Sequence, residues 1–414
     1  MPGQQSEHTH TVRVARSEPQ DQGGEDTAMD TLERYVRALG REAVDRVPIG
    51  AMISLPYWSR ALSVGSHLAQ HITAHPMQWV EFQEQLGFDP IIFAQWFREP
   101  YITAWPDAFF AWPPGATGDW QIRNQIVERS QGGALVRRSI RTPLGEMTSL
   151  LKRERFQKWV MQHPLQDESD LEHLWYRPDP AQVDTTALER VISTVGSRAL
   201  VMLIVPGAFD EASHWRGMQS LIMDIFDRPR WVHRLMGLCS DYTVRLVQRL
   251  ASTGLHSLMI AESSVGVGIS PKMFREFVLP YDRRIADTCR QAGILTSLHI
   301  CGRSSALLES MADTGADAIE PLVPAACAGD TDLADAKRRV GHRVSLMGGF
   351  NPRVLTEGTV DDVRVEASKC LEAAARGGGY ILRTAEQIFE ARPENLRAFV
   401  EAGRELGRYG SPLL

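Results

Sequence analysis

The chain has 414 residues, of which 43% are apolar and 23% are charged. This composition is that of a globular protein long enough to bury a large core, and it excludes an intrinsically disordered chain. The 45 basic and 51 acidic side chains leave a formal charge of −6, which argues against a nucleic-acid binder with a concentrated basic surface. No run reaches the roughly 18 apolar residues that span a bilayer. We therefore expect a small-molecule substrate, with neither nucleic acid nor membrane as a partner.

The N-terminus and the cysteines indicate the cellular compartment. Residues 1–26 are polar and contain no aromatic residue, so we expect a disordered tail there, followed by one domain over residues 27–414. The tail lacks the apolar stretch of a secretory signal. Five scattered cysteines are too few for a disulfide framework. The sequence therefore predicts a cytoplasmic protein with reduced thiols. The cysteines are Cys239, Cys289, Cys301, Cys327 and Cys370.

Eight short apolar runs alternate with amphipathic stretches. Several runs are rich in Val and Ile, which is typical of strands buried on both faces of a parallel sheet. The stretches between them carry helix signals, such as Ser270-Pro271 at a start and three glycines after Arg376 at an end. This alternation predicts an α/β fold, a (β/α)₈ TIM barrel. The alternative is an open doubly wound sheet, but no G-x-G-x-x-G follows the first run. The runs are Val47–Ile53, Asp89–Ala94, Leu200–Val205, Ser257–Ala261, Leu295–Ile300, Ala316–Ile319, Val344–Met347 and Tyr380–Leu382.

An aromatic-rich insertion, at about residues 95–198, follows the second predicted strand. It is much longer than a usual βα loop. Within it, Ala134–Arg141 and Met147–Leu151 are predicted to pair as a hairpin. Its tryptophans either form a lid over the site or build a subsidiary core. They are Trp96, Trp105, Trp112 and Trp120.

His299-Ile300-Cys301 is the main candidate for a metal site. In a barrel, function lies at the carboxyl ends of the strands, and residues two apart in a strand point the same way. Imidazole and thiolate suit Zn²⁺, and a carboxylate from a neighbouring strand end could complete the ligand set. Glu386 is our choice for the third ligand, with Glu262, Glu320 and Cys327 as alternatives. The competing interpretation is a histidine hydrogen-bonded beside a buried cysteine.

Other residues at the predicted strand ends are candidates for catalysis and substrate binding. Glu262 and Glu320 could carry protons, and Asn351 could hydrogen-bond the substrate. Asn351 could instead only start the turn before Pro352. Tyr57, Trp58 and Trp96 could form a wall against a planar ligand such as an arene, a pterin or a corrinoid.

Five motifs in the C-terminal half resemble the uroporphyrinogen decarboxylase superfamily. Their order and spacing over about 150 residues is far more specific than any one of them. A fainter match, Asp45–Pro48, lies where the first strand of that family begins. The family fold is a (β/α)₈ barrel, and homodimers are common among such barrels. The motifs are Ile269–Phe274 with Phe277–Tyr281, Leu298–Gly302, Gly315–Pro321, Met347–Pro352 with Leu355–Thr359, and Gly378–Leu382 with Arg392–Leu396.

Within the superfamily, the chain is most similar to the zinc-dependent methyltransferases that act with a methylcobamide, coenzyme M or tetrahydrofolate. The resemblance implies that His299 and Cys301 hold zinc, while Glu386 stands where the branch has a second cysteine. It implies methyl transfer between a corrinoid or a methylated small molecule and a thiol or tetrahydrofolate, as in O-demethylation. The chain has no D-x-H-x-x-G segment, so a separate corrinoid protein would carry the methyl group.

Two alternatives to methyl transfer stay open. The first is a metal-free decarboxylase or lyase on the same barrel, and the second is a non-catalytic ligand-binding barrel. The true decarboxylases grip substrate carboxylates with an Arg-rich N-terminal motif. The corresponding stretch here, residues 48–60, has Arg60 as its single basic side chain, and several carboxylates would need several Arg forks.

Overall fold

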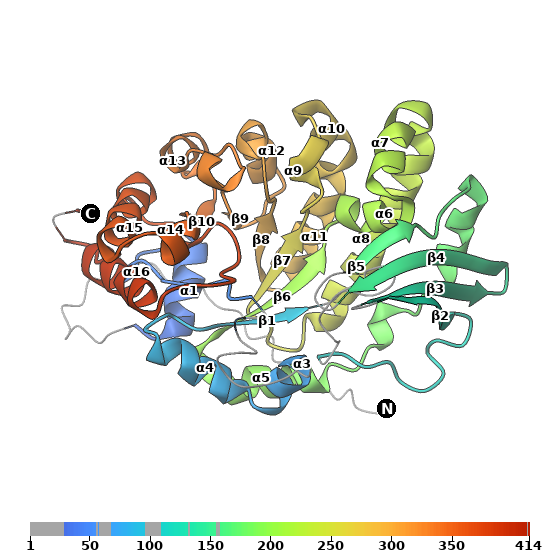
Figure 1. Cartoon of the computed structure of the whole chain (residues 1–414), viewed down its shortest axis with the longest axis horizontal. Helices are drawn as coiled ribbons and strands as arrows, with labels where there is room; N and C mark the ends of the chain where they lie inside the picture. Colours follow the sequence, from blue (N-terminus) through green and yellow to red (C-terminus); the bar gives the residue numbers. More distant parts are fainter. Residues whose placement is uncertain are drawn as a thin grey trace, which may run out of the picture.

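The computed structural model of the chain describes residues 29–54, 57, 68–95, 109–130, 133–154, 158–411 and 413–414. Within these residues, seven parallel strands form one curled sheet in which every strand lies next to its neighbour in the chain (Figure 1). This sequential order excludes the doubly wound alternative, whose strand order reverses at a switch point. The fold is α/β and resembles a TIM barrel. The strands are β1 (Ile91–Gln95), β6 (Leu200–Pro206), β7 (Ser257–Ala261), β8 (Leu295–His299), β9 (Ala318–Glu320), β10 (Ser345–Phe350) and β11 (Tyr380–Thr384).

The segment predicted as the first strand, Val47–Ile53, joins this sheet through isolated bridges instead of a continuous ladder. Ile49 pairs with Leu382 in β11, and Ile53 pairs with Ile388 beyond it. On its other side, the Ile49 carbonyl accepts a hydrogen bond of 2.9 Å from the Asp89 amide, just before β1. The prediction of a regular strand here was wrong, because the backbone hydrogen bonds of this segment, such as the one from the Gly50 amide to the Leu382 carbonyl, occur at separate positions and form no continuous ladder.

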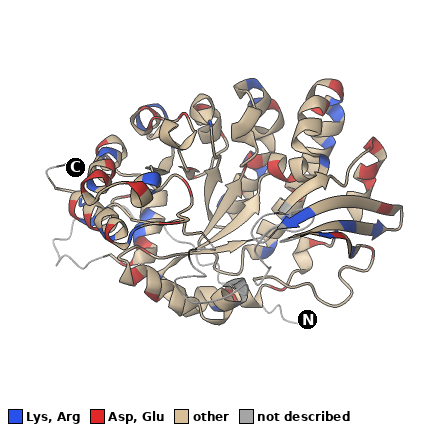
Figure 2. Cartoon of the chain, viewed as in Figure 1, with Lys and Arg blue, Asp and Glu red and all other residues tan. Residues whose placement is uncertain are grey.

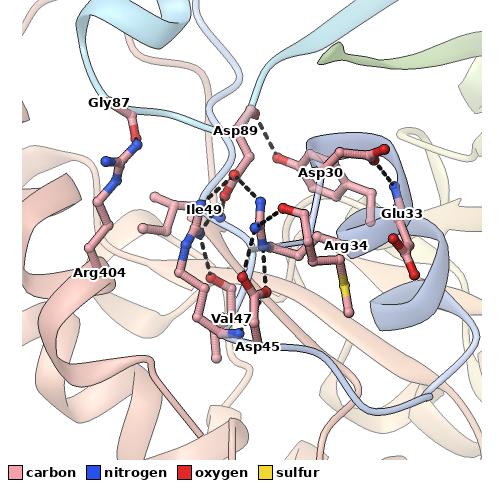
Figure 3. A network of polar contacts seen from close by, with 12 residues as sticks. Asp30, Glu33, Arg34, Asp45, Val47, Ile49, Gly87, Asp89 and Arg404 are labelled. Carbon is pink, nitrogen blue, oxygen red and sulfur yellow. Dashed lines mark hydrogen bonds and ion pairs between the residues drawn. The ribbon is translucent and has the colours of Figure 1, made fainter. Parts of the chain in front are cut away.

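A buried network of ion pairs holds the seam together (Figure 3). The Asp89 carboxylate accepts from Arg34 Nη1 at 2.9 Å, from Arg46 at 2.6 and 2.7 Å, and from the Ile49 amide at 2.8 Å. Arg34 also binds Asp45 through two nitrogens. The network therefore connects helix α1 (Thr31–Leu39) to residues 45–49 and to Asp89 before β1. It also gives Asp45 and Arg46 a structural role directly before the apolar run.

Helices lie around the outside of the curled sheet (Figure 1). Alternate strand residues such as Leu203 and Leu258 pack against them, while Met202 and Met259 pack inside the sheet with Tyr35 of α1. None of the described helices combines the length and apolar character of a membrane span. The helices are α1 (Thr31–Leu39), α3 (Leu68–Ala74), α4 (Pro76–Gln85), α5 (Thr186–Val195), α6 (Ala208–Arg216), α7 (Met218–Asp227), α8 (Pro229–Leu250), α9 (Val265–Gly268), α10 (Pro271–Phe277), α11 (Leu279–Gln291), α12 (Leu308–Asp313), α13 (Leu333–Val340), α14 (Arg353–Glu357), α15 (Val360–Ala374) and α16 (Pro393–Leu406).

The stretch between β1 and β6 contains a four-stranded antiparallel sheet that projects from one side of the molecule (Figure 1). The predicted hairpin is confirmed, since Ile140 pairs with Met147. Trp120 is buried and packs edge-on against Trp215, which favours the subsidiary core for this tryptophan. Figure 2 shows Lys and Arg along this sheet, although the whole chain is acidic. Its strands are β2 (Gln121–Ser130), β3 (Gly133–Thr142), β4 (Gly145–Glu154) and β5 (Lys158–Gln162).

Several expectations fall outside the described residues. The tail predicted over residues 1–26 does so, as do Trp58, Trp96 and Trp105. They stay predictions.

Candidate metal and substrate site at the carboxyl ends of the strands

His299 and Cys301 lie side by side at the end of β8. His299 is the last residue of the strand, and its Nε2 atom is 2.9 Å from Cys301 Sγ. Ile300, between them, is fully buried in the core cluster that the helices share. The strand alternation therefore turns the imidazole and the thiol to the inner side of the sheet together.

Glu320, the last residue of β9, lies next to the Nδ1 atom of the His299 imidazole. It stands opposite His299 in the strand register, and its Oε2 atom is 3.4 Å from His299 Nδ1. Its Oε1 atom accepts a 2.5 Å hydrogen bond from Ser297 Oγ, and Arg383 Nη2 donates to Oε2. Glu320 and Arg383 are both fully buried. A carboxylate in this position can accept a hydrogen bond from Nδ1, and it holds the imidazole so that Nε2 faces Cys301 Sγ, the orientation in which a histidine binds a metal through its second nitrogen.

The charges around the pair favour a thiolate. Burial alone would raise the pKa of the Cys301 thiol, but the charge and the hydrogen bond of His299 outweigh it, so the pKa of Cys301 lies below its ordinary value. The pKa of Glu386 lies above its ordinary value because burial raises it by more than the electrostatic interaction with His299 lowers it. A lowered thiol pKa is typical of a reactive or metal-binding cysteine.

Glu386 and Cys327, two of the four candidates for a third ligand, border the same groove. The groove has a volume of about 670 Å³, and Arg353 lies on its wall. Glu386 is near enough to His299, Cys301 and Cys327 to interact with each of them electrostatically. Within the described ranges, no three His, Cys, Asp or Glu side chains are already arranged as a metal site. The structure thus brings the first two predicted ligands into contact and leaves the third beside them.

The Glu262 carboxylate, expected to carry protons at the strand-end site, forms hydrogen bonds with backbone amides. Its oxygens accept hydrogen bonds from the amides of Phe209 and Asp210, at 2.9 and 2.7 Å, at the start of α6. Burial, with the nearby carboxylates of Asp282 and Asp210, raises the pKa of Glu262 well above its usual value. The structure therefore places this carboxyl at the N-terminus of α6 and does not bring it to the His299–Cys301 pair.

Asn351 and Tyr57 are the remaining described candidates. Asn351 Oδ1 accepts from the Arg353 amide at 3.0 Å and from Cys327 Sγ at 3.1 Å. The hydrogen bond with the Arg353 amide is typical of an asparagine that starts a turn, the alternative role predicted for Asn351. Tyr57 is partly buried and packs against the main core cluster, and its amide lies 3.4 Å from Ser54 Oγ.

Sequence reasoning missed Arg383 and Ser297. Both residues lie within strands, Ser297 in β8 and Arg383 in β11, and point to the inner side of the sheet. The sequence analysis considered only residues at the ends of the predicted strands. For Arg383 the available signal was a charged residue directly after the apolar run Tyr380–Leu382, because a fully buried arginine is rare unless it is paired.

Comparison with known proteins assigns the family. The family model of uroporphyrinogen decarboxylase (URO-D) matches residues 134–406. The chain therefore belongs to the uroporphyrinogen decarboxylase family, as the five motifs predicted. The uroporphyrinogen decarboxylases of Shewanella halifaxensis and Hydrogenovibrio crunogenus are similar to it, with 31% identity over 185 residues and 29% over 187. Each match covers 44% of this chain and 50% of the relative, so the chain spans about half the length of the curated relatives it matches.

A solved structure shares the fold over a greater length. The methyltransferase from Methanosarcina mazei superposes with a TM-score of 0.63 at 17% identity, covering 91% of this chain and 99% of that one. At this identity the likeness establishes a common fold and leaves the reaction to be argued from the site.

Proposed function

We propose that the chain is a zinc-dependent methyltransferase that moves a methyl group between a corrinoid, or a methylated small molecule, and a thiol or tetrahydrofolate. The observation that carries the proposal is the contact of His299 Nε2 with Cys301 Sγ at a strand end, with Glu320 behind the imidazole. Nitrogen and sulfur donors with a carboxylate behind the histidine form the donor set that zinc prefers. The family membership and the methyltransferase that shares the fold support the same class of reaction.

In this proposal His299, Cys301 and Glu386 hold the metal, with Cys327 as the competing third ligand. Zinc supplies Lewis acidity, which keeps a bound thiol deprotonated at neutral pH. The protein's own residues have separate tasks. Glu320 fixes the orientation and tautomer of His299, and Ser297 and Arg383 in turn fix Glu320. A small acceptor or donor would approach along the groove beside Glu386.

The proposal extends to location and partner. All five cysteines are free in the structure, which suits a reducing cytoplasm. The 414 residues contain no D-x-H-x-x-G segment, so we propose that a corrinoid co-substrate arrives on a separate protein. The curated relatives are named as decarboxylases. We favour methyl transfer because residues 48–60 contain a single arginine, too few to grip several carboxylates.

Metal analysis of the purified full chain tests the proposal. We expect about one zinc per chain in the wild type and little in His299→Ala and Cys301→Ser. Cys239→Ala removes a thiol buried in α8 and should leave the zinc content unchanged. Loss of methylcobalamin absorbance with a thiol or tetrahydrofolate as acceptor then measures methyl transfer. A folded wild type that takes up no zinc and transfers no methyl group would refute the proposal.

A further inference from the structure

The antiparallel sheet between β1 and β6 ends on one side in a long strand with a free edge. All ten residues of β2 are exposed to solvent. Within the described residues, β3 is the one strand that pairs with β2, and no amide or carbonyl of β2 forms a backbone hydrogen bond outside the sheet. Natural proteins normally keep such edges short, charged or covered, because the free backbone groups can pair with another chain.

Two isoleucines line this edge on one face of the sheet. Ile122 and Ile126 lie opposite Ile140 and Val136, which are buried, yet 39% of Ile122 and 46% of Ile126 stay exposed. Residues 121–126 run in regular register up to the bulge that follows Ile126. An edge that only has to avoid pairing would carry charged side chains at these two positions. The strand therefore offers a regular apolar stretch to another chain.

The same sheet is strongly basic (Figure 2). The strands β2–β5 contain eight Lys and Arg and three Asp and Glu, so they carry +5 in a chain whose formal charge is −6. Strand alternation places Arg123 on the face away from the isoleucines, together with Arg137 and Arg141 of β3. These three arginines are exposed, and none of them forms an ion pair with another described residue. The edge thus combines an apolar face with a positively charged face.

We propose that β2 binds an extended segment of an acidic protein, which adds to the sheet as a fifth strand. Strand addition uses the free backbone groups for affinity and alternate side chains for specificity. One set of alternate side chains in the segment is apolar and packs against Ile122 and Ile126. The other set is acidic and lies near Arg123, while Arg137 and Arg141, one strand further in, add to the electrostatic attraction.

The charge and the free edge together favour a protein over other occupants. A second copy of the chain that paired through its own β2 would bring two sheets of charge +5 together, and like charges on paired strands are destabilising. A nucleic acid could not complete a β-ladder, and the rest of the chain, which carries −11, would repel its phosphates. None of these residues belongs to the strand-end site, so the inference does not depend on the proposed function.

Peptide binding to the full chain tests this inference. The probe is a fluorescein-labelled heptapeptide of alternating glutamate and valine, and its binding is followed by fluorescence anisotropy at low salt. We expect it to bind about 10-fold or more tightly than the matched peptide of lysine and valine, and to bind more weakly as the salt concentration rises. The same glutamate–valine peptide with every backbone amide N-methylated cannot complete the ladder and should not bind.

Two combined variants test whether the binding depends on this edge. The variant Arg123→Gln, Arg137→Gln, Arg141→Gln should bind the glutamate–valine peptide about 10-fold more weakly, the combined factor of three exposed ion pairs. The variant Ile122→Thr, Ile126→Thr keeps β-branched side chains, which suit a strand, and should also weaken binding.

A matched control removes three exposed arginines from the opposite side of the molecule, where α13, α15 and α16 lie (Figure 1). It combines Arg338→Gln in α13, Arg376→Gln after α15 and Arg397→Gln in α16, and it should bind the peptide as the wild type does.

Several results would overturn the inference. They are equal binding of the two peptides to the wild type, binding of the N-methylated peptide, binding that survives in the variant of the sheet arginines, and binding that is lost in the control variant. Tighter binding of a short DNA duplex than of the peptide would assign the basic sheet to nucleic acid instead. A wild-type dimer in sedimentation that becomes a monomer in the isoleucine variant would make a second copy of the chain the occupant of the edge.

Discussion

Glu320→Gln tests whether the buried carboxylate controls the imidazole that would bind zinc. The substitution keeps the size of the side chain and removes its charge. Glu320 is 0% exposed and contacts Ser297, His299 and Arg383, so the amide must face several donors with a single acceptor oxygen. The Arg383 guanidinium is left as a buried charge without its counterion.

Two magnitudes follow from these contacts. Removing one partner of a buried ion pair costs about 3–5 kcal/mol of folding stability. Loss of a carboxylate behind a metal-binding histidine costs about 10–100-fold in metal affinity, which is about 1.4–2.7 kcal/mol. We therefore expect Glu320→Gln to unfold at lower urea concentration and to bind zinc one to two orders of magnitude more weakly.

Competition with a chromophoric chelator gives the zinc affinity, and urea unfolding followed by circular dichroism gives the stability. Glu309→Gln is the control, because Glu309 pairs with Arg339 at the surface with 52% of its side chain exposed. Such pairs contribute about 0–1 kcal/mol, and zinc binding should not change. If Glu320→Gln bound zinc as tightly as the wild type while remaining folded, the orienting role of Glu320 would be refuted.

The remaining predictions concern the seam, a buried histidine and the third ligand. Asp89→Ala should cost about 3–5 kcal/mol in urea unfolding, because two arginines lose a buried counterion; a loss below about 1 kcal/mol would contradict the role of the network. Burial lowers the pKa of His256 from 6.5 to about 4, so between these pH values the unfolded chain binds more protons than the folded chain and stability rises with pH. His256→Asn should flatten that rise in stability curves measured from pH 4 to 7, and an unchanged slope would disprove the assignment. Glu386→Gln should weaken zinc binding more than Cys327→Ser does, and the reverse order of zinc affinities would make Cys327 the third ligand.

Much of the fold could be predicted because its signals are local. Buried parallel strands need continuous apolar runs, so seven of the eight predicted runs coincide with strands of the sheet. Helix starts were equally readable, since Ser270 Oγ accepts from the Met273 amide at 3.2 Å with Pro271 in the first turn. The helix that starts there, α10, ends at Phe277, and a second helix, α11, begins at Leu279. Pro280, which lacks an amide hydrogen, stands in the first turn of the second helix.

The candidate site was predictable only in part. Strand alternation placed His299 and Cys301 together without knowledge of any other strand. The same reasoning put Glu262 among the catalytic groups, because it could not foresee that α6 would begin beside that carboxyl. A strand end reveals which residue is present, while its partner depends on the neighbouring elements.

The sequence by itself determined the order of strands and helices, the family and the shared direction of the imidazole and the thiol, because each depends on residues close together in the chain. The tertiary structure alone decided which carboxylate stands behind His299, why Arg383 is tolerated in a buried strand and how the segment at residues 47–53 meets both ends of the sheet. These contacts join residues that are far apart in the chain, such as Glu320 and Arg383, which are 63 positions apart, and Ile49 and Leu382. Sheet register, the direction of each side chain and exclusion of water fix such contacts together, and no local pattern encodes all three.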